Sequence, residues 1–181
     1  MIIPQVTFKT RTGDNEALGG ACSIGGEWKN VTTNELFKKK KIVLFSLPGA
    51  FTPTCSSQQL PGYESRYEDL KKFVDEVYCL SVNDSFVMNA WAQNQKLENV
   101  KVIPDGNGEF TDAMDMLVEK RDRCFGMRSW RYAMVVNNSV IEEMFIEPGK
   151  DDNVIEDPYG ESSPENVLKY LQSKRLDSNA I

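Results

Sequence analysis

The chain has 181 residues, of which 40% are hydrophobic, and its formal net charge is -6. This length and apolar content suit one adequate core, so we expect a single domain spanning residues 1–181. The negative charge argues against nucleic acid and anionic membrane surfaces as partners, and no segment approaches the roughly 20 apolar residues of a membrane helix.

The first part of the chain alternates between strand and turn patterns. Gln5 to Lys9 and a return strand over Glu27 to Val31 predict an N-terminal β-hairpin. Cys22 lies between two glycine pairs, which places it on a turn. We then expect a short helix over Thr32–Phe37 and a solvated turn over Lys38–Lys41. No signal peptide precedes these elements, so we expect a cytoplasmic protein.

A buried strand and a helix start follow. The apolar run Ile42–Leu47 is closed by Pro48-Gly49, which is a turn signal. Thr52 followed by Pro53 has the pattern of an N-cap and a first helical residue. Cys55 is then the third helical residue, where backbone N–H groups have no intrahelical partner and the helix dipole favours an anion. The helix start therefore favours the thiolate, which is the reactive form of cysteine.

The remaining elements continue the alternation of helix and strand. We expect the Cys55 helix to reach about Gln59, to bend at Pro61-Gly62 and to resume over Tyr63–Phe73. The later elements are strands over Val77–Val82, Val100–Ile103, Tyr132–Val136 and Val140–Ile146, helices over Phe86–Gln95, Thr111–Met116 and Ser162–Gln172, a turn at Asn137-Asn138 and a surface loop over Gly149–Pro158. This order predicts an α/β fold with a central mixed β-sheet flanked by helices.

The histidine and cysteine contents restrict the chemistry. The sequence has no histidine, which excludes Ser-His-Asp and Cys-His catalysis and histidine-based metal sites. Its four cysteines are widely spaced and include no Cys-x-x-Cys pair, so we expect neither a disulfide framework nor a bound metal or cofactor. An activated cysteine here must rely on a helix end, hydroxyl groups or arginine.

The stretch around Cys55 carries a family resemblance. Pro48, Thr52 and Cys55 fit the Pro-x-x-x-Thr-x-x-Cys signature of peroxiredoxins, and the longer Pro-Gly-Ala-Phe-Thr-Pro-Thr-Cys-Ser string resembles the type II (peroxiredoxin-5-like) subfamily. Further stretches that resemble this subfamily are Ser81–Trp91, Pro104–Gly106, Arg128–Tyr132 and Val135–Asn138. The resemblance is closest to the peroxidase part of bacterial hybrids in which a glutaredoxin domain follows, and it implies a thioredoxin-like fold.

The resemblance implies reduction of hydrogen peroxide and organic hydroperoxides. Cys55 would attack one peroxide oxygen and become a sulfenic acid. The Thr52 hydroxyl, in the same helical turn, can approach the sulfur and the peroxide, and the stiff ring of Pro48 can shield the thiolate from water or simply end the strand. The resemblance places the arginine that bonds thiolate and peroxide at Arg131; a guanidinium suits this role because it stays charged and offers several donors. Arg128 is the competitor, with a surface or interface ion pair as its ordinary role.

The sequence gives less direct information on which thiol reduces oxidised Cys55. Animal members of the family use a late resolving cysteine, and the matching region, Glu147–Ser163, contains none. Cys79 matches the second cysteine of plant-type members, but its mid-strand position is typical of a buried core residue. Cys124 and Cys22 are interpreted as loop thiols without an assigned task. We therefore expect a one-cysteine cycle recycled by glutathione and glutaredoxin; Gln59, where many relatives have histidine, leaves the donor preference open.

Other interpretations remain. Thioredoxin would be the reductant if Cys79 resolves, and a redox-signalling or holdase oligomer is a non-enzymatic alternative. Because the chain stops soon after Leu171, we expect any participating glutaredoxin to be a separate protein. Family members commonly form dimers, so we expect a homodimer, with Phe51 and Trp130 as interface candidates and a core position as the equal alternative for Trp130.

Overall fold

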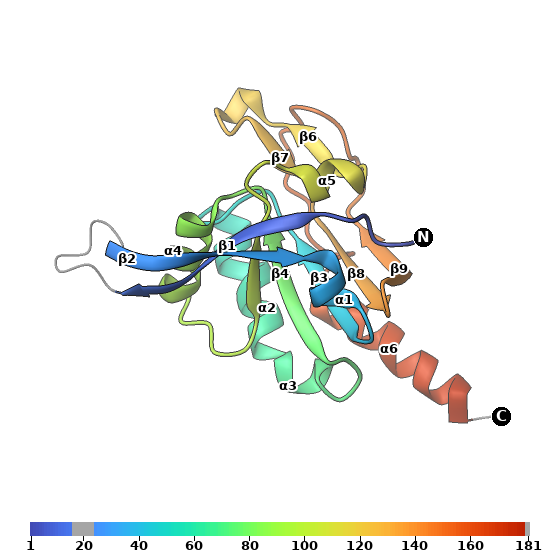
Figure 1. Ribbon diagram of the computed structural model, residues 1–181. Helices are drawn as coiled ribbons and strands as arrows, with labels where there is room; N and C mark the ends of the chain where they lie inside the picture. Colours follow the sequence, from blue (N-terminus) through green and yellow to red (C-terminus); the bar gives the residue numbers. More distant parts are fainter. Residues whose placement is uncertain (16–23, 180–181) are drawn as a thin grey trace.

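A five-stranded mixed sheet forms the centre of the protein (Figure 1). The computed structural model describes residues 1–15 and 24–179. The strands, in spatial order, are β5 (Lys101–Pro104), β4 (Glu76–Ser81), β3 (Lys41–Ser46), β8 (Tyr132–Asn137) and β9 (Val140–Ile146). β3, β4 and β5 are mutually parallel, whereas β8 is antiparallel to both β3 and β9. This arrangement confirms the predicted α/β fold with a mixed sheet.

Each face of the sheet has its own hydrophobic core, because alternate residues of a strand point to opposite faces. Val43 and Phe45 belong to one core, and Ile42 and Leu44 belong to the other. The helices α2 (Leu60–Ser65), α3 (Tyr67–Leu70), α4 (Ser85–Asn94) and α6 (Pro164–Asn179) contribute to the Val43 core. The opposite core receives residues from α1 (Thr33–Phe37), α5 (Glu109–Ala113) and the hairpin of β1 (Thr7–Asn15) and β2 (Ile24–Thr32).

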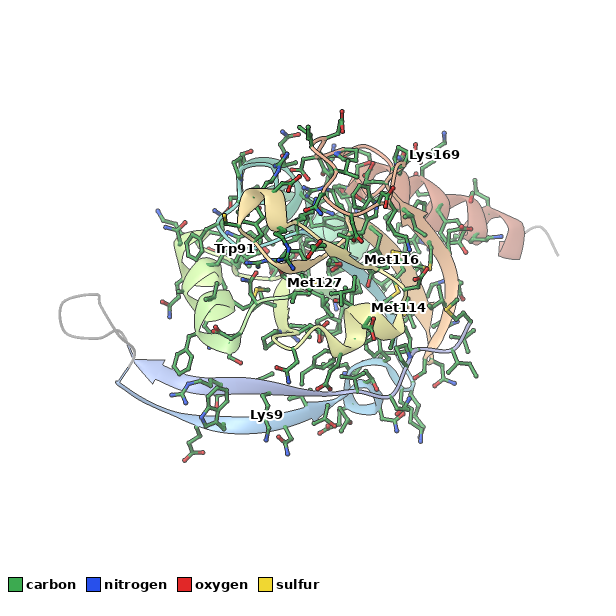
Figure 2. The ribbon with its side chains drawn as sticks, turned by 90° about the horizontal axis from the view of Figure 1, so that it is seen from above. Lys9, Trp91, Met114, Met116, Met127 and Lys169 are labelled. Atoms are coloured by element: carbon green, nitrogen blue, oxygen red, sulfur yellow. The ribbon has the colours of Figure 1, made fainter. Side chains whose placement is uncertain are left out.

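The N-terminal hairpin is confirmed and is longer than its sequence pattern indicates. It lies across one face of the sheet in Figure 1, where Phe8 packs against Phe110 with ring centroids 5.7 Å apart. Cys22, predicted to lie on the hairpin turn, is outside the described residues. Met114 and Met116, which follow α5, are buried in the same core as Phe8, so packing accounts for them (Figure 2).

The helix that carries Cys55 differs from its predicted form. Helical structure starts at Pro53, becomes a π-helix over Cys55–Gln59, and continues directly into α2. The predicted bend at Pro61-Gly62 is therefore wrong, and the break falls at Arg66, between α2 and α3. The π-type bonding ends where the Leu60 N–H bonds the Cys55 carbonyl, one residue before Pro61, which has no N–H to donate.

Two short strands and the start of a helix in the second half also differ from the sequence prediction. Two three-residue strands, β6 (Leu117–Glu119) and β7 (Met127–Ser129), flank a 3₁₀ turn and are too short to give a periodic signal. The helix predicted from Thr111 begins at Glu109, because the buried Asp105 carboxylate accepts hydrogen bonds from the Phe110 and Thr111 N–H groups.

The hairpin between β8 and β9 turns one residue later than predicted. Asn138 and Ser139 have φ values of 47° and 67°, so they are the turn residues, and Asn137 still pairs with Val140 in the sheet. Positive φ at both central positions is the geometry of a tight hairpin turn, which asparagine tolerates. The strands on both sides lie where the sequence indicates.

Candidate active site

The loop between β3 and the Cys55 helix is anchored by its neighbours. The Leu47 N–H donates to the Leu80 carbonyl at 3.3 Å, and the Ala50 N–H donates to Asn83 Oδ1 at 3.0 Å. Pro48, between them, is buried. These contacts fix the loop that leads into the first helical turn.

Thr52 occupies the N-cap position by its backbone. Its carbonyl accepts the first helical hydrogen bond, from the Ser56 N–H at 3.0 Å, and Cys55 is the third helical residue, as predicted. The predicted side-chain cap is not formed; the Thr52 hydroxyl instead donates to the Gly49 carbonyl at 2.7 Å. Because its proton is engaged there, the Thr52 oxygen keeps lone pairs that can accept a hydrogen bond.

The sheet register brings Arg131 to Cys55. Tyr132, the first residue of β8, pairs with Ser46, the last residue of β3, so the residue before Tyr132 lies beside the loop that follows Ser46. Arg131 Nη1 is 3.5 Å from Cys55 Sγ, and both side chains are buried, with relative exposures of 1% and 0%. The thiol of the first helical turn therefore faces a buried guanidinium.

Two further side chains hold this guanidinium. Arg131 Nη1 donates to Gln59 Oε1 at 2.6 Å, and Nη2 donates to Asp157 Oδ1 at 2.6 Å. Arg131 Nε is buried and has no hydrogen-bond partner within the described part of the chain. Although burial opposes the charge, the negative charges of the Cys55 thiolate form and of the Asp157 carboxylate raise the pKa of Arg131, so the residue stays cationic.

The buried carboxylate of Glu147 is connected to the Arg131 guanidinium through hydrogen bonds of Ser162 and Gln59. Glu147 is 2% exposed, and its Oε1 accepts hydrogen bonds from the Gly160 N–H, the Ser162 N–H and the Ser162 hydroxyl at 2.9, 2.8 and 2.7 Å. Ser162 Oγ is in turn 3.4 Å from Gln59 Nε2. A continuous hydrogen-bonded path thus joins Glu147, Ser162, Gln59 and Arg131 to Cys55.

Sequence reasoning missed Asp157, Glu147 and the contact between Gln59 and Arg131. Gln59 follows Cys55 by four residues, a spacing that puts both on one side of a helix, so this signal was present. Asp157 lies in the acidic stretch that the sequence predicts to be a surface loop. Nothing in that stretch distinguishes it from its neighbouring acids.

The other predicted candidates take structural positions. Arg128 donates to the Phe125 carbonyl at 3.0 Å and to the Val82 carbonyl at 3.1 Å, so it ties loops together; no surface ion pair of Arg128 is found among the described residues. Trp130 is 1% exposed and donates to the Glu147 carbonyl at 2.8 Å, which is the core alternative rather than the interface one. Phe51 is exposed.

The cysteines other than Cys55 differ in accessibility. Cys79 is fully buried in the middle of β4, as the core interpretation predicts, and this burial, with a smaller effect of Cys55, raises the pKa of its thiol well above the ordinary value. Cys124 is exposed at the end of the 3₁₀ turn, with a φ of 56°.

Comparison with known proteins gives the family. A family model described as Redoxin matches residues 7–159. A peroxiredoxin of Rhizobium etli is 55% identical over 94% of both chains, and the hybrid peroxiredoxin hyPrx5 of Haemophilus influenzae is 52% identical over 99% of this chain and 68% of its own length. The chain belongs to the peroxiredoxins of the Redoxin family.

The structural comparison agrees with this assignment. The crystal structure of the Plasmodium falciparum antioxidant protein (1-Cys peroxiredoxin) superimposes with a TM-score of 0.86 at 37% identity, covering 96% of this chain and 98% of the other. The thioredoxin-like fold and the resemblance seen in the sequence are confirmed. As a peroxiredoxin, the protein is a thiol peroxidase.

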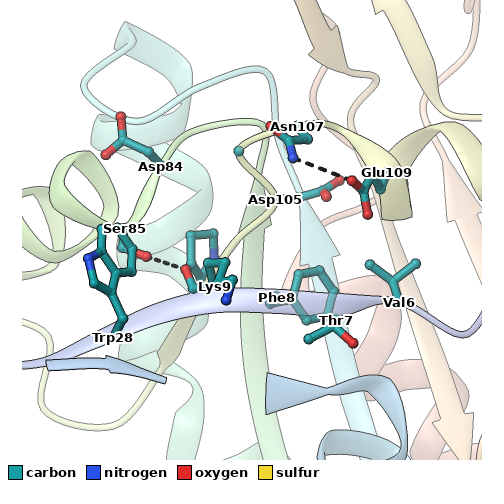
Figure 3. Close-up of a pocket in the computed structure, with 12 residues that line it drawn as sticks. Val6, Thr7, Phe8, Lys9, Trp28, Asp84, Ser85, Asp105, Asn107 and Glu109 are labelled. Atoms are coloured by element: carbon teal, nitrogen blue, oxygen red, sulfur yellow. Dashed lines mark hydrogen bonds between the residues drawn. The ribbon is translucent and has the colours of Figure 1, made fainter. Parts of the chain in front are cut away.

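A surface cavity of the peroxiredoxin lies away from Cys55 (Figure 3). This cavity, of about 190 Å³, lies between β1 and the loop from β5 to α5, and its lining includes Phe8 of the core on the opposite side of the sheet from Cys55. Among the residues that the structure describes, no three potential metal ligands gather, and no helix is long and apolar enough to cross a bilayer.

Asp157 gives the peroxiredoxin a testable pH dependence. Although burial raises its pKa, the Arg131 charge and hydrogen bonds from Thr54 and Arg131 outweigh burial and lower the pKa below its ordinary value. Ionised Asp157 therefore stabilises the fold above pH about 4, and the contribution is lost as the pH falls through the lowered pKa.

We expect Asp157→Asn to be destabilised at pH 7 and to approach the wild type as the pH is lowered toward 3. Urea unfolding at a series of pH values measures this difference. Glu156→Gln, a neighbouring change of the same charge, is the control. A stability difference for Asp157→Asn that is constant between pH 7 and 3 would contradict the ion pair.

Proposed function

We propose that Cys55 is the peroxidatic cysteine of this thiol peroxidase. The contact between Cys55 Sγ and the buried guanidinium of Arg131, in the first turn of a helix, carries the proposal. The thiolate attacks one oxygen of a hydroperoxide; an S–O bond forms, the O–O bond breaks, and the other oxygen leaves as water or an alcohol after taking up a proton. The sulfur is oxidised to a sulfenic acid and the peroxide is reduced. Hydrogen peroxide and organic hydroperoxides are the proposed substrates.

The residues around Cys55 receive roles from their geometry. Arg131 carries a charge fixed by Gln59 and Asp157 before the substrate arrives, and its free Nε–H is available to the oxygen on which charge develops. The Thr52 oxygen accepts the hydrogen bond of the peroxide O–H, since its own proton is donated to Gly49. Pro48 limits water access to the thiolate from its buried position in the loop.

We assign the reduction of the sulfenic acid to glutathione and glutaredoxin. Cys79 is buried in the central sheet, and Cys124 lies in an exposed turn, so neither offers an accessible partner beside Cys55 in this conformation. The Plasmodium falciparum relative is a 1-Cys peroxiredoxin by name, which also supports a one-cysteine cycle.

Thioredoxin-dependent recycling through Cys79 is the second candidate. Cys79 and Cys55 belong to the same hydrophobic core, so both thiols lie on one side of the central sheet. A disulfide between them would require the part of β4 that carries Cys79 to open during the cycle.

Steady-state peroxide consumption distinguishes the two cycles. We expect Cys55→Ser to be inactive and Cys79→Ser to keep turnover with glutathione and glutaredoxin, although a hydroxyl at this buried position is expected to lower stability by about 1–3 kcal/mol. Thioredoxin supplied alone tests the alternative in the same variants. If Cys79→Ser reduces one equivalent of peroxide and then stops, Cys79 resolves Cys55 and the one-cysteine cycle is wrong.

A further inference from the structure

A second cavity lies beside the loop that carries Asp157, the ion-pair partner of Arg131. It has a volume of about 280 Å³ and lies between the turn that follows β6 and the loop over residues 149–158. Its lining residues are Lys120, Asp122, Arg123, Asn153, Val154 and Ile155. The lining therefore holds two cations and one anion, although the whole chain has a net charge of -6. We refer to it as the Lys120 cavity.

Lys120 is buried without a counterion in contact. Its side chain is 4% exposed, and its ammonium lies over the indole ring of Trp130, 5.4 Å from the centroid. Among the described residues, no carboxylate forms an ion pair with this ammonium; Asp157, which pairs with Arg131, acts on its charge only from beyond contact distance. Lysine is almost never this buried unless paired, because removing an ammonium from water is unfavourable. An anion entering the cavity would relieve that penalty.

Hydrogen bonds join the two walls of the Lys120 cavity. The Asn153 N–H donates to the Glu119 carbonyl at 2.7 Å, and the Glu119 N–H donates to Asp152 Oδ1 at 2.7 Å. The Arg123 guanidinium donates to the Ile155 carbonyl. These bonds tie the two walls together, so little ordering is needed for binding.

The wall of the cavity that contains Ile155 belongs to the loop that carries Asp157, the ion-pair partner of the guanidinium beside Cys55. Trp130, which supports the Lys120 ammonium, precedes Arg131 in the chain, and Ile155 precedes Asp157, the ion-pair partner of Arg131, by two residues. Two residues of chain span at most about 7 Å, and a tripeptide spans at most about 11 Å. The cavity therefore lies within a few residues of the Asp157–Arg131 ion pair that faces Cys55, which is the length scale of a small peptide-like thiol.

We propose that the Lys120 cavity binds a carboxylate of the thiol that reduces oxidised Cys55, and that this thiol is anionic, of the glutathione class. The inference rests on the proposed one-cysteine cycle. The thiol attacks the Cys55 sulfenic acid; an S–S bond forms, the S–O bond breaks, and the hydroxyl leaves with the thiol proton as water. A second thiol then displaces Cys55, giving the oxidised disulfide of the reductant and the free Cys55 thiol.

The kinetic test compares an anionic thiol with a neutral one. The protein is oxidised with one equivalent of hydrogen peroxide, and the reduction of its sulfenic acid by glutathione or by 2-mercaptoethanol is followed. Lys120→Met keeps the length of the side chain and removes its charge; we expect the glutathione rate constant to fall about tenfold, and the 2-mercaptoethanol rate constant to change less than about twofold. Lys120→Arg should restore the glutathione rate.

Two further variants test whether the glutathione rate constant depends on the charge inside the Lys120 cavity rather than on charge elsewhere on the protein. Asp122→Asn removes the anion of the cavity and should raise the glutathione rate constant about twofold. Lys72→Met, an equal charge change at an exposed site, should leave it unchanged because surface charges are screened. Equal losses for both thiols in Lys120→Met, or no loss for either, would overturn the proposal.

A binding measurement separates this inference from the identity of the reductant. S-methylglutathione, which has no free thiol, is titrated into the reduced protein while the three tryptophan indole N–H signals are recorded by nitrogen-15 NMR. We expect the Trp130 signal to shift in the wild type and not in Lys120→Met, with Trp28 and Trp91 as internal references. A Trp130 signal that does not move overturns the cavity site, whichever thiol sustains turnover. A shift in a protein that glutathione does not reduce would retain the site and refute the proposed reductant.

Discussion

Replacing Arg131 by lysine is expected to lower the rate constant for peroxide reduction about 100- to 1000-fold, the loss typical of removing one preorganised donor from a site of developing charge. Arg131 uses separate nitrogens for Cys55 and Gln59 on one side and Asp157 on the other. A single ammonium cannot reproduce that planar arrangement, and a buried lysine can lose its proton. The fluorescence change on mixing with hydrogen peroxide in a stopped-flow instrument measures the rate.

Arg128→Lys is the matched control for this prediction. Arg128 lies near Gly49 of the same loop, but its guanidinium bonds the carbonyls of Phe125 and Val82 rather than the thiol. We expect less than about a tenfold loss of rate, because the loop keeps its other anchors. Equal losses in Arg131→Lys and Arg128→Lys would show that both act on the loop and that Arg131 has no direct role.

Replacing Glu147 by leucine is expected to destabilise the protein by at least about 3 kcal/mol. One buried carboxylate oxygen accepts from Gly160 and twice from Ser162, and the substitution leaves these donors unpaired at about 1–3 kcal/mol each. For a chain of this size the expected fall in Tm is roughly 6–12 °C. Thermal unfolding followed by circular dichroism measures it.

The Glu147 prediction has two controls on the same loop. Glu147→Gln keeps an acceptor oxygen, so we expect it to lose roughly half as much stability. Glu161→Leu changes an exposed neighbour and should leave the Tm within about 1 °C. A Glu147→Leu protein as stable as Glu161→Leu would mean that solvent or a rearranged loop satisfies the three donors.

The sequence predicts the sheet well because its central strands are apolar runs bounded by strong turn signals. Val77–Val82, for example, overlaps β4 and lies between charged and capping residues. The predictions are wrong where the controlling partner is distant or the element is short. Asp105 starts α5 through its side chain, and β6 and β7 are three residues each.

In the candidate site too, local pattern predicted the locally determined features correctly but not the contacts between distant residues. Thr52 and Cys55 lie in one local segment, so capping rules place the thiol correctly in the first helical turn. The contact of Cys55 with Arg131 depends on the pairing of Ser46 with Tyr132, which the family resemblance supplies and local pattern does not. Asp157 and Glu147 act across long separations in the chain, and their spacing to Arg131 carries no periodic signal.

The most direct test of the account is to locate the sulfenic acid. The reduced wild type, Cys55→Ser and Cys79→Ser are each mixed with one equivalent of hydrogen peroxide in the presence of dimedone, and the labelled peptides are identified by mass spectrometry. The account predicts the label on Cys55 alone in the wild type and in Cys79→Ser, and no peroxide consumption by Cys55→Ser. A label on another cysteine, or a Cys55→Ser protein that still consumes peroxide, would contradict it.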